Sequence, residues 1–217
     1  MTDPQKTALI TGASRGFGAA LAEALAPTHH VIALARTVGA LEELDDRIQA
    51  TGGSATLVPL DAKDTDGISR LCASIHDRWG GLNLWVNTIV HAPPLSPVPH
   101  IAASDFSKSI AHGLTMTQTL IANIDPLLAA TSGTAVHLDD PRAGQKFFGA
   151  YGAAKAGQKA LFDSWAAEVE STDRTMISFE PRPMPTATRA RFFPGENREA
   201  LSSCAAEAAR LCALLDL

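Results

Sequence analysis

The sequence is short of the features that mark several large classes of protein. Only three of its 217 residues are cysteine, and these are far apart without a CxxC spacing, so neither a disulfide framework nor a cysteine metal site is expected. Basic residues do not outnumber acidic ones, since 18 Lys and Arg stand against 23 Asp and Glu. Because this balance leaves no basic stripe to neutralise a phosphate backbone, nucleic acid is not an expected partner.

Long apolar runs are also lacking. No apolar stretch approaches the roughly 18 residues of a membrane span. The polar start, residues 1–6, has neither the charged nor the apolar region of a secretion signal. We therefore expect a cytoplasmic protein without a membrane partner. The seven histidines are dispersed, and the adjacent pair His29-His30 falls where a helix-to-strand turn is expected, so solvation explains it better than ligand binding. No metal site is predicted.

What the sequence does contain is an alternation of short apolar runs with longer stretches of helical periodicity. Candidate strands cover residues 7–11, 31–34, 55–60, 82–87, 134–138 and 175–179, and helical stripes cover 17–26, 68–79, 106–128, 151–171 and 205–215. The segments 91–100 and 186–202 are expected to be loops. This alternation is typical of a parallel sheet covered by helices on both faces. Residues 1–217 are thus predicted to form a single doubly wound α/β domain.

The first expected strand ends in a glycine-rich turn that passes directly into an amphipathic helix. The turn reads Gly12-Ala13-Ser14-Arg15-Gly16-Phe17-Gly18. In this context glycines let the backbone approach a pyrophosphate, and the start of the helix supplies N–H donors and a favourable dipole. The turn therefore predicts dinucleotide binding. The alternative is a tight turn that uses glycine for its geometry alone.

The glycine spacing TGxxxGxG resembles that of the short-chain dehydrogenase/reductase family, and other motifs extend the resemblance over nearly the whole chain. Tyr151 and Lys155 match the family's YxxxK pair, and Asn87 matches the first residue of its NNAG segment. Asp61 matches the aspartate that binds the adenine amino group, and the run from Pro181 to Thr186 matches the PG-x-x-x-T segment over the nicotinamide. The resemblance implies a Rossmann fold with about six strands in the order 3-2-1-4-5-6.

The end of the second expected strand bears on which dinucleotide is bound. A carboxylate there favours the free 2′-hydroxyl of NAD, whereas a basic residue favours the 2′-phosphate of NADP. Here Ala35 stands in place of the family's NAD-selecting aspartate, Arg36 follows it, and Arg15 is a second cation within reach. Because guanidinium groups bind phosphate bidentately, NADP(H) is predicted. The alternative is that both arginines are solvated surface residues.

Tyr151 and Lys155 are one helical turn apart, so they lie on the same face of their predicted helix. Tyr151 is also the only tyrosine in the chain. The pKa of a phenol is about 10, and a nearby ammonium favours its ionised form, so the pair is expected to supply and accept a proton while the cofactor moves a hydride. The resemblance adds a hydrogen bond from Lys155 to the nicotinamide ribose.

The rest of the family's catalytic tetrad is missing. Where the family has a serine that binds the substrate oxygen, this chain carries Asp139 and Asp140, and the tetrad asparagine is matched by His112. An ionised Asp140 would oppose formation of a phenolate, whereas a protonated one could donate a hydrogen bond. His112 could supply a donor or join a proton relay. The alternative for the acidic pair is a solvated loop.

Two functions of different classes therefore stay open. The first is an NADP(H)-dependent oxidoreductase of the carbonyl reductase or alcohol dehydrogenase type, with Tyr151 as acid and base and Lys155 as its electrostatic support. The second is an NADP(H)-binding homologue with little or no turnover that acts as a sensor or partner subunit. The family resemblance also implies a homodimer paired through the fourth and fifth helices, residues 114–128 and 153–169.

Overall fold

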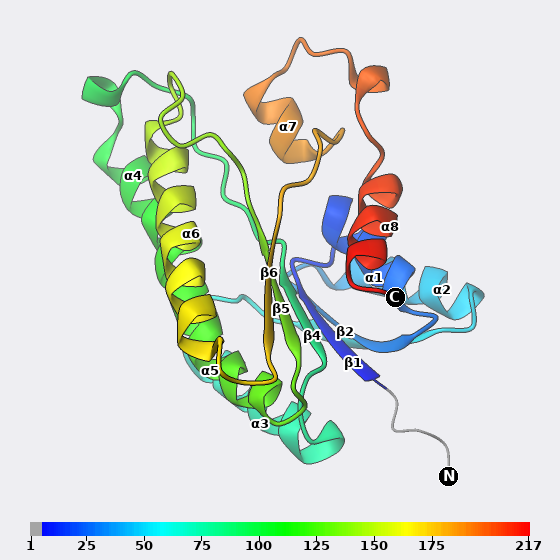
Figure 1. Cartoon of the computed structure of the whole chain (residues 1–217). Coiled ribbons are helices and arrows are strands. Elements are labelled where there is room, and N and C mark those ends of the chain that lie inside the picture. Colours follow the sequence, from blue (N-terminus) through cyan, green and yellow to red (C-terminus); the bar gives the residue numbers. More distant parts are fainter. Residues whose placement is uncertain (1–5) are drawn as a thin grey trace.

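The structure, a computed structural model, describes residues 6–217, and its centre is a parallel six-stranded sheet (Figure 1). The strand order is β3-β2-β1-β4-β5-β6, as expected. The strands are β1 (Lys6–Thr11), β2 (His29–Ala35), β3 (Ser54–Pro59), β4 (Leu84–Asn87), β5 (Thr134–Leu138) and β6 (Thr175–Phe179). The chain thus builds one half of the sheet outward from β1, then returns to the centre and builds the other half from β4.

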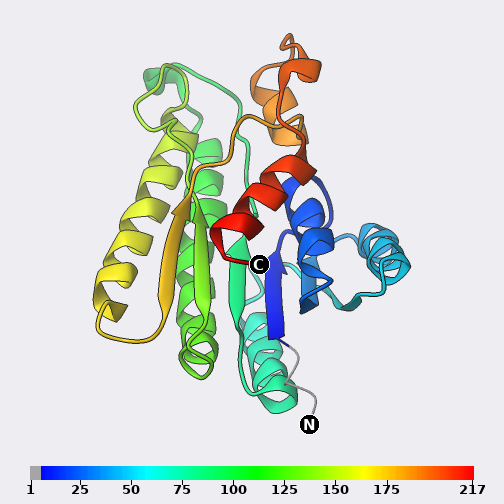
Figure 2. The same cartoon turned by 45° about the vertical axis from the view of Figure 1, so that its right-hand side comes forward.

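Helices cover both faces of this sheet (Figures 1 and 2). One layer contains α1 (Gly16–Leu25), α2 (Val38–Ala50) and α8 (Cys204–Leu214), and the other contains α3 (Thr65–Trp79), α5 (Met116–Ala129) and α6 (Gly149–Val169). Successive side chains of a strand point to opposite faces. In β1, Ala8 and Ile10 accordingly pack in the apolar cluster under the first layer, while Leu9 packs in the cluster under the second.

Three segments differ from the sequence-based expectation. The helix α2 was not expected from the sequence. Only Leu41, Leu44 and Ile48 of its residues are buried, so its apolar stripe is narrow. The segment 186–202 contains the short helix α7 (Ala187–Phe192), so the prediction of a plain loop there was wrong. The stretch 106–128 is not one regular helix either, since α4 (Ala103–Ser109) is followed by a wider π-helical turn, Ile110–Thr115, before α5 begins.

The prediction of a solvated turn at His29-His30 was also wrong, because both residues belong to β2 and are buried. Nδ1 of His30 lies 2.8 Å from Ser54 Oγ, and its Nε2 lies 2.8 Å from Thr56 Oγ1 on the neighbouring β3. Nδ1 of His29 lies 2.8 Å from Thr28 Oγ1. Burial lowers the pKa of both imidazoles, so the pair forms neutral polar contacts inside the sheet.

None of the helices within residues 6–217 has the length and apolar character that a membrane span requires. Over the same residues, no three His, Cys, Asp or Glu side chains are grouped as metal ligands.

The packing makes one quantitative prediction about the central strand. Ile10 is 0% exposed in β1, whereas Val38 at the start of α2 is 51% exposed. Ile10→Ala should lower the free energy of unfolding by about 2–5 kcal/mol, because it leaves a cavity in the core. Val38→Ala should change it by less than about 0.5 kcal/mol. Urea unfolding followed by tryptophan fluorescence measures both, and similar losses in the two variants would contradict the assigned position of β1.

Candidate active site

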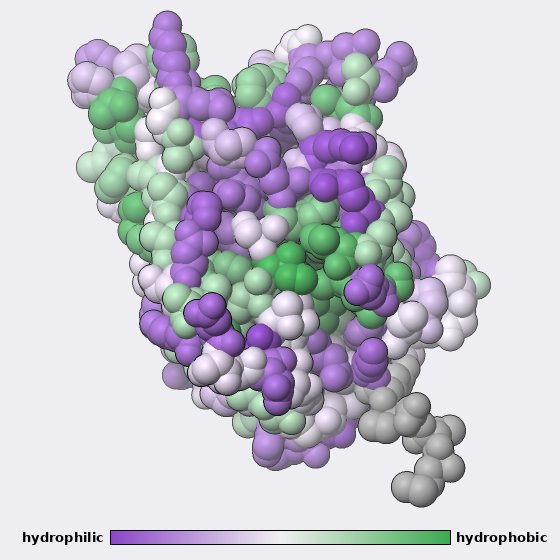
Figure 3. All heavy atoms as spheres, in the orientation of Figure 1, coloured by the Kyte–Doolittle hydropathy of each residue, from purple (hydrophilic) through white to green (hydrophobic). Residues whose placement is uncertain are grey.

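A cleft of about 500 Å³ follows the carboxyl edge of the sheet. It lies where β1 and β4 lead away to opposite sides, the place at which open α/β sheets bind ligands. The space-filling view shows the molecule hollowed at its upper end between the α6 side and the α7 side, with mainly hydrophilic side chains around the hollow (Figure 3). Of the residues singled out from the sequence, these line the cleft: Gly12, Ser14, Arg15, Gly16, Phe17, Gly18, Arg36, Asp61, His112, Asp140, Tyr151, Lys155, Pro181 and Thr186.

The glycine turn packs tightly against the segment that follows β4. A Cβ atom on Gly18 would lie 2.4 Å from the Gly12 carbonyl oxygen and 2.5 Å from Thr88 Oγ1, and the φ angle of Gly12 is +93°. Thr88 Oγ1 donates to the carbonyl oxygens of Thr11 and Gly12 at 2.9 and 3.1 Å. A threonine in the broken NNAG segment therefore fixes the turn, a role that sequence reasoning missed.

The start of α1 is open to an anion. Its capping residue, Arg15, makes no side-chain hydrogen bond to the helix, so no side chain caps the N–H groups of the first turn. Arg15 and Arg36 are both exposed at the cleft, and neither forms an ion pair with any residue that the structure describes. Asp61 also lines the cleft, and its carboxylate accepts from Lys63 N at 3.0 Å. This lining fits a phosphorylated dinucleotide.

Asn87 is the one residue of the sequence-based set that lies outside the cleft lining. Its Oδ1 accepts from Thr11 Oγ1 at 2.9 Å and from Ile89 N at 3.2 Å, and its Nδ2 donates to Thr117 Oγ1 at 3.4 Å. It lines a separate cavity of about 20 Å³ beneath Lys155 instead. The structure thus uses Asn87 to tie the end of β4 to β1 and α5.

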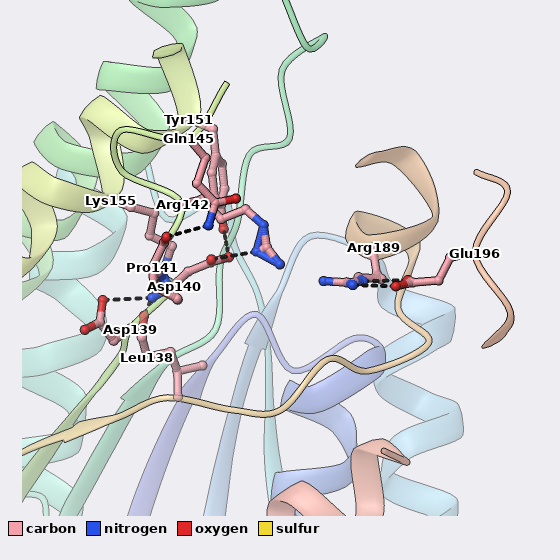
Figure 4. Close-up of polar contacts among 10 residues, drawn as sticks. All are labelled: Leu138, Asp139, Asp140, Pro141, Arg142, Gln145, Tyr151, Lys155, Arg189 and Glu196. Atoms are coloured by element: carbon pink, nitrogen blue, oxygen red, sulfur yellow. Dashed lines mark hydrogen bonds and ion pairs between the residues drawn. The ribbon is translucent and has the colours of Figure 1, made fainter. Parts of the chain in front are cut away.

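At the other end of the cleft, Tyr151 and Asp140 are joined directly (Figure 4). The Tyr151 hydroxyl donates to Asp140 Oδ2 at 2.8 Å, and Asp140 Oδ1 accepts from Arg142 Nη1 at 2.9 Å. The Tyr151 side chain starts from the first turn of α6 and is 4% exposed. Asp140 is therefore part of a polar network around the tyrosine, and the alternative of a solvated acidic loop does not describe it.

The electrostatics of Tyr151 differ from the expectation based on Lys155. Burial raises the pKa of Tyr151, and Asp140 raises it further as a nearby negative charge and hydrogen-bond acceptor, whereas Arg142 lowers it. The Lys155 ammonium donates to the Leu138 carbonyl oxygen at 3.0 Å. The pKa of Tyr151 is therefore raised, in contrast to the lowering by Lys155 that the sequence led us to expect.

Lys155 is itself buried, and its ammonium has more N–H donors than the one hydrogen bond it makes among the described residues. Burial lowers the pKa of its ammonium, while Asp140 and Asp139 oppose that shift. An ammonium has three N–H donors, and within residues 6–217 its hydrogen bond goes to the Leu138 carbonyl. Lys155 also lines the cleft, so the structure leaves donors of this ammonium for a bound ligand.

Comparison with known proteins decides the family. The family model described as short chain dehydrogenase matches residues 6–197. The chain belongs to this family. The Rossmann fold agrees with that membership. The relatives that the next comparisons name are oxidoreductases.

Three similar proteins illustrate the relationship. Ketoacyl reductase HetN of Nostoc sp. is 27% identical over 173 residues, which are 77% of this chain and 59% of that protein. Sorbitol dehydrogenase of Cereibacter sphaeroides is 29% identical over 163 residues, 73% of this chain and 62% of that protein. The chain thus spans less than two thirds of the length of these relatives. An alcohol dehydrogenase of Thermococcus sibiricus, solved with 5-hydroxy-NADP, shares the fold with a TM-score of 0.86, at 23% identity, covering 98% of this chain and 91% of that chain.

The short chain dehydrogenase site of this chain has a second histidine that sequence reasoning missed. His91, in the segment predicted as a loop, stacks on His112 with ring centres 5.0 Å apart. Nδ1 of His112 lies 2.8 Å from the Lys108 carbonyl oxygen, and both rings line the cleft. Burial lowers the pKa of His91, and the neighbouring His112 lowers it further. The structure thus places His112 at the cleft in a stacked pair.

The segment between β6 and α7 is held by an acidic residue that sequence reasoning also missed. Glu207 of α8 is buried, and its carboxylate accepts from Arg182 N at 2.9 Å and from Ser202 Oγ at 2.8 Å. Farther along, Thr186 Oγ1 accepts from Arg189 N at 3.2 Å and caps α7. A glutamate on the inward face of a predicted amphipathic helix was the available signal for this anchor.

The close packing of the glycine turn gives a direct test. Gly18→Ala would push a methyl group into the Gly12 carbonyl, so we expect at least a tenfold weaker affinity for NADPH and a loss of about 1–3 kcal/mol of stability. Gly195→Ala is the matched control, because its Cβ would meet no heavy atom within 4 Å. Fluorescence titration and urea unfolding measure the two effects. Wild-type affinity in Gly18→Ala would show that the turn does not carry the dinucleotide.

Proposed function

We propose that this short chain dehydrogenase is an NADP(H)-dependent oxidoreductase that interconverts a small carbonyl compound and the corresponding alcohol. The observation that carries the proposal is one cleft that has at one end an uncapped helix start and two arginines without an ion pair among residues 6–217, and at the other end a buried Tyr and a buried Lys. A nucleotide bound along this edge would reach from the phosphate-binding end to the proton-transfer end. The substrate would then meet Tyr151 beside the nicotinamide.

The lining residues divide naturally among the parts of NADP(H). When bound, the nicotinamide supplies or accepts a hydride. The residues that would hold the group are Gly12, Ser14, Gly16, Phe17 and Gly18 at the pyrophosphate, Arg15 and Arg36 at the 2′-phosphate, Asp61 at the adenine, Lys155 at the ribose, and Pro181 and Thr186 at the nicotinamide. The NADP derivative bound by the Thermococcus sibiricus relative supports this choice of cofactor.

The chain's own residues provide the proton transfer. Tyr151 is 4% exposed and holds a proton on Oη, and a positioned acid or base of this kind contributes about 10²–10⁴ in rate. Lys155 supports the site with a positive charge, and the acidic pair Asp139-Asp140 stands where the resemblance expects the family's serine. His112 borders the same space and is a candidate donor to the substrate oxygen.

A second function is favoured by one observation. Burial and Asp140 together raise the pKa of Tyr151, which makes the phenol a weaker acid than the family mechanism requires. An NADP(H)-binding sensor or partner subunit with little turnover would have the same cofactor end without an efficient catalytic end. In either case we propose a cytoplasmic homodimer paired through residues 114–128 and 153–169, as the family resemblance implies.

The choice of NADP(H) can be tested at Arg36. Arg36→Ala removes a charged hydrogen-bonding group from the 2′-phosphate, so the Kd for NADPH should rise roughly 10- to 100-fold while the Kd for NADH stays nearly constant. Arg47→Ala is the control, since Arg47 is an exposed arginine paired with Glu23. Isothermal titration calorimetry gives all the constants. An unchanged Kd for NADPH in Arg36→Ala would remove the basis for the phosphate site.

The catalytic assignment is tested by Tyr151→Phe. This change keeps the ring and its packing but removes the proton, so NADPH oxidation should vanish while NADPH affinity changes less than about threefold. Lys155→Ala should reduce both, because the ammonium serves the ribose and the site. The assay follows NADPH absorbance with a panel of aldehydes, ketones and quinones. Tight binding without oxidation by the wild type across the whole panel would favour the second function.

A further inference from the structure

Arg142 is a charged residue at the proposed catalytic end that the sequence did not single out. It lies in the loop between β5 and α6, two residues after Asp140, and it donates to Asp140 Oδ1 (Figure 4). Because Asp140 Oδ2 accepts from Tyr151, the carboxylate is held from both sides. A carboxylate with both oxygens engaged has little freedom to rotate away from the tyrosine.

The guanidinium of Arg142 packs against two aromatic rings. Its central carbon lies 5.5 Å from the centre of the Phe148 ring and 5.3 Å from that of Phe193. The side chain is only 16% exposed, and its Nε is buried without a hydrogen-bond partner among the described residues. The orientation of Arg142 is thus set by Asp140 and by two rings from different segments.

We propose that Arg142 is a positioning residue that holds Asp140 as the proton acceptor of Tyr151, so that a Tyr–Asp relay replaces the serine-assisted chemistry of the family. This inference rests on the proposed oxidoreductase function and adds to it the route of the proton. Asp140 is the catalytic residue in this relay, because it touches the reacting hydroxyl. Arg142 acts only through Asp140.

In this relay an alcohol substrate is oxidised, and the oxidant is an oxidised nicotinamide dinucleotide. The substrate C–H bond breaks and its hydrogen leaves as hydride to the dinucleotide. The substrate O–H proton passes to Tyr151 Oη, while the Tyr151 proton passes along the existing hydrogen bond to Asp140 Oδ2. The products are a carbonyl compound, the reduced dinucleotide and a protonated Asp140, and carbonyl reduction runs through the same transfers in reverse.

The surroundings of Asp140 suit a proton that must reach solvent. Its side chain is 26% exposed, so the acid formed in the relay can return its proton to water. The charged and titratable groups that face it come from the loop and from two helices: Asp139, Arg142, Tyr151, Lys155 and Arg189. Alcohol oxidation by this route requires an ionised Asp140, whereas carbonyl reduction requires a protonated one.

The kinetic test compares Asp140 and Arg142 with a control on the same loop. Asp140→Asn keeps the acceptor for the Tyr151 hydroxyl but cannot take its proton, so kcat for alcohol oxidation should fall about 10²- to 10³-fold with little change in NADP affinity. Arg142→Met should lower kcat about tenfold and move the acid limb of its pH profile to higher pH, because the carboxylate loses its cation. Arg142→Lys should restore part of the profile, and Lys146→Met should behave as the wild type.

A spectroscopic readout uses the fact that Tyr151 is the only tyrosine in the chain. Protein labelled with ¹³C at the tyrosine Cζ gives one resonance, and its shift should show an inflection when Asp140 takes a proton. The inflection should be lost in Asp140→Asn, move to higher pH in Arg142→Met and stay in place in Lys146→Met. This measurement needs neither substrate nor turnover.

The outcomes separate the relay from the proposed function. If the wild type oxidises no substrate but the resonance behaves as described, the oxidoreductase proposal fails while the positioning of Asp140 by Arg142 stands. If Arg142→Met lowers only thermal stability and leaves both the pH profile and the inflection unmoved, Arg142 is structural and the inference is wrong. Wild-type kcat in Asp140→Asn would likewise remove Asp140 from the proton route.

Discussion

The reversal of strand order between β1 and β4 is the constraint on which the rest of the molecule depends. Because the chain builds β2 and β3 on one side of β1 and then β4, β5 and β6 on the other, the loops after β1 and β4 diverge and leave the carboxyl edge of the sheet open between them. Thr88 and Gly18 then pack against Gly12 at close range and fix the floor of that opening. The cleft is thus a consequence of topology, and its lining is a consequence of which residues end each strand.

The two ends of the cleft differ in their electrostatics. At the α1 end, the helix start has no side-chain cap and the exposed arginines have no ion-pair partner among the described residues. This positive charge suits a phosphate group. At the α6 end, two ion pairs are already formed within the chain, Asp140 with Arg142 and Arg189 with Glu196. The first end therefore offers unpaired positive charge, whereas the second holds Tyr151 in an internal hydrogen-bond network. This difference distinguishes the proposed cofactor site from the proposed catalytic site.

Sequence reasoning identified the residues of the cleft where the pattern lies among neighbours along the chain. The glycine turn, the Tyr151–Lys155 spacing and Arg36 at a strand end are local patterns, and the structure brings them to one cleft. It failed where the role depends on a distant partner. No local pattern shows that Glu207 accepts a hydrogen bond from the backbone of Arg182, or that His30 contacts a side chain of β3. Nor does it show that Lys155 donates to Leu138, or that burial and Asp140 raise the pKa of Tyr151.

The sequence by itself therefore determined the α/β class through its β–α alternation, and the strand order and the family through the motifs that carry the resemblance. Those features follow from periodicity and short motifs, which act over a few residues. Only the tertiary structure decided that Asn87 joins neighbouring strands and that α7 lies beside the proposed active site. It also decided that Asp140 accepts hydrogen bonds from both Tyr151 and Arg142. The physical reason is that hydrogen bonds, burial and the resulting pKa shifts depend on distances in space, which the order of residues does not state.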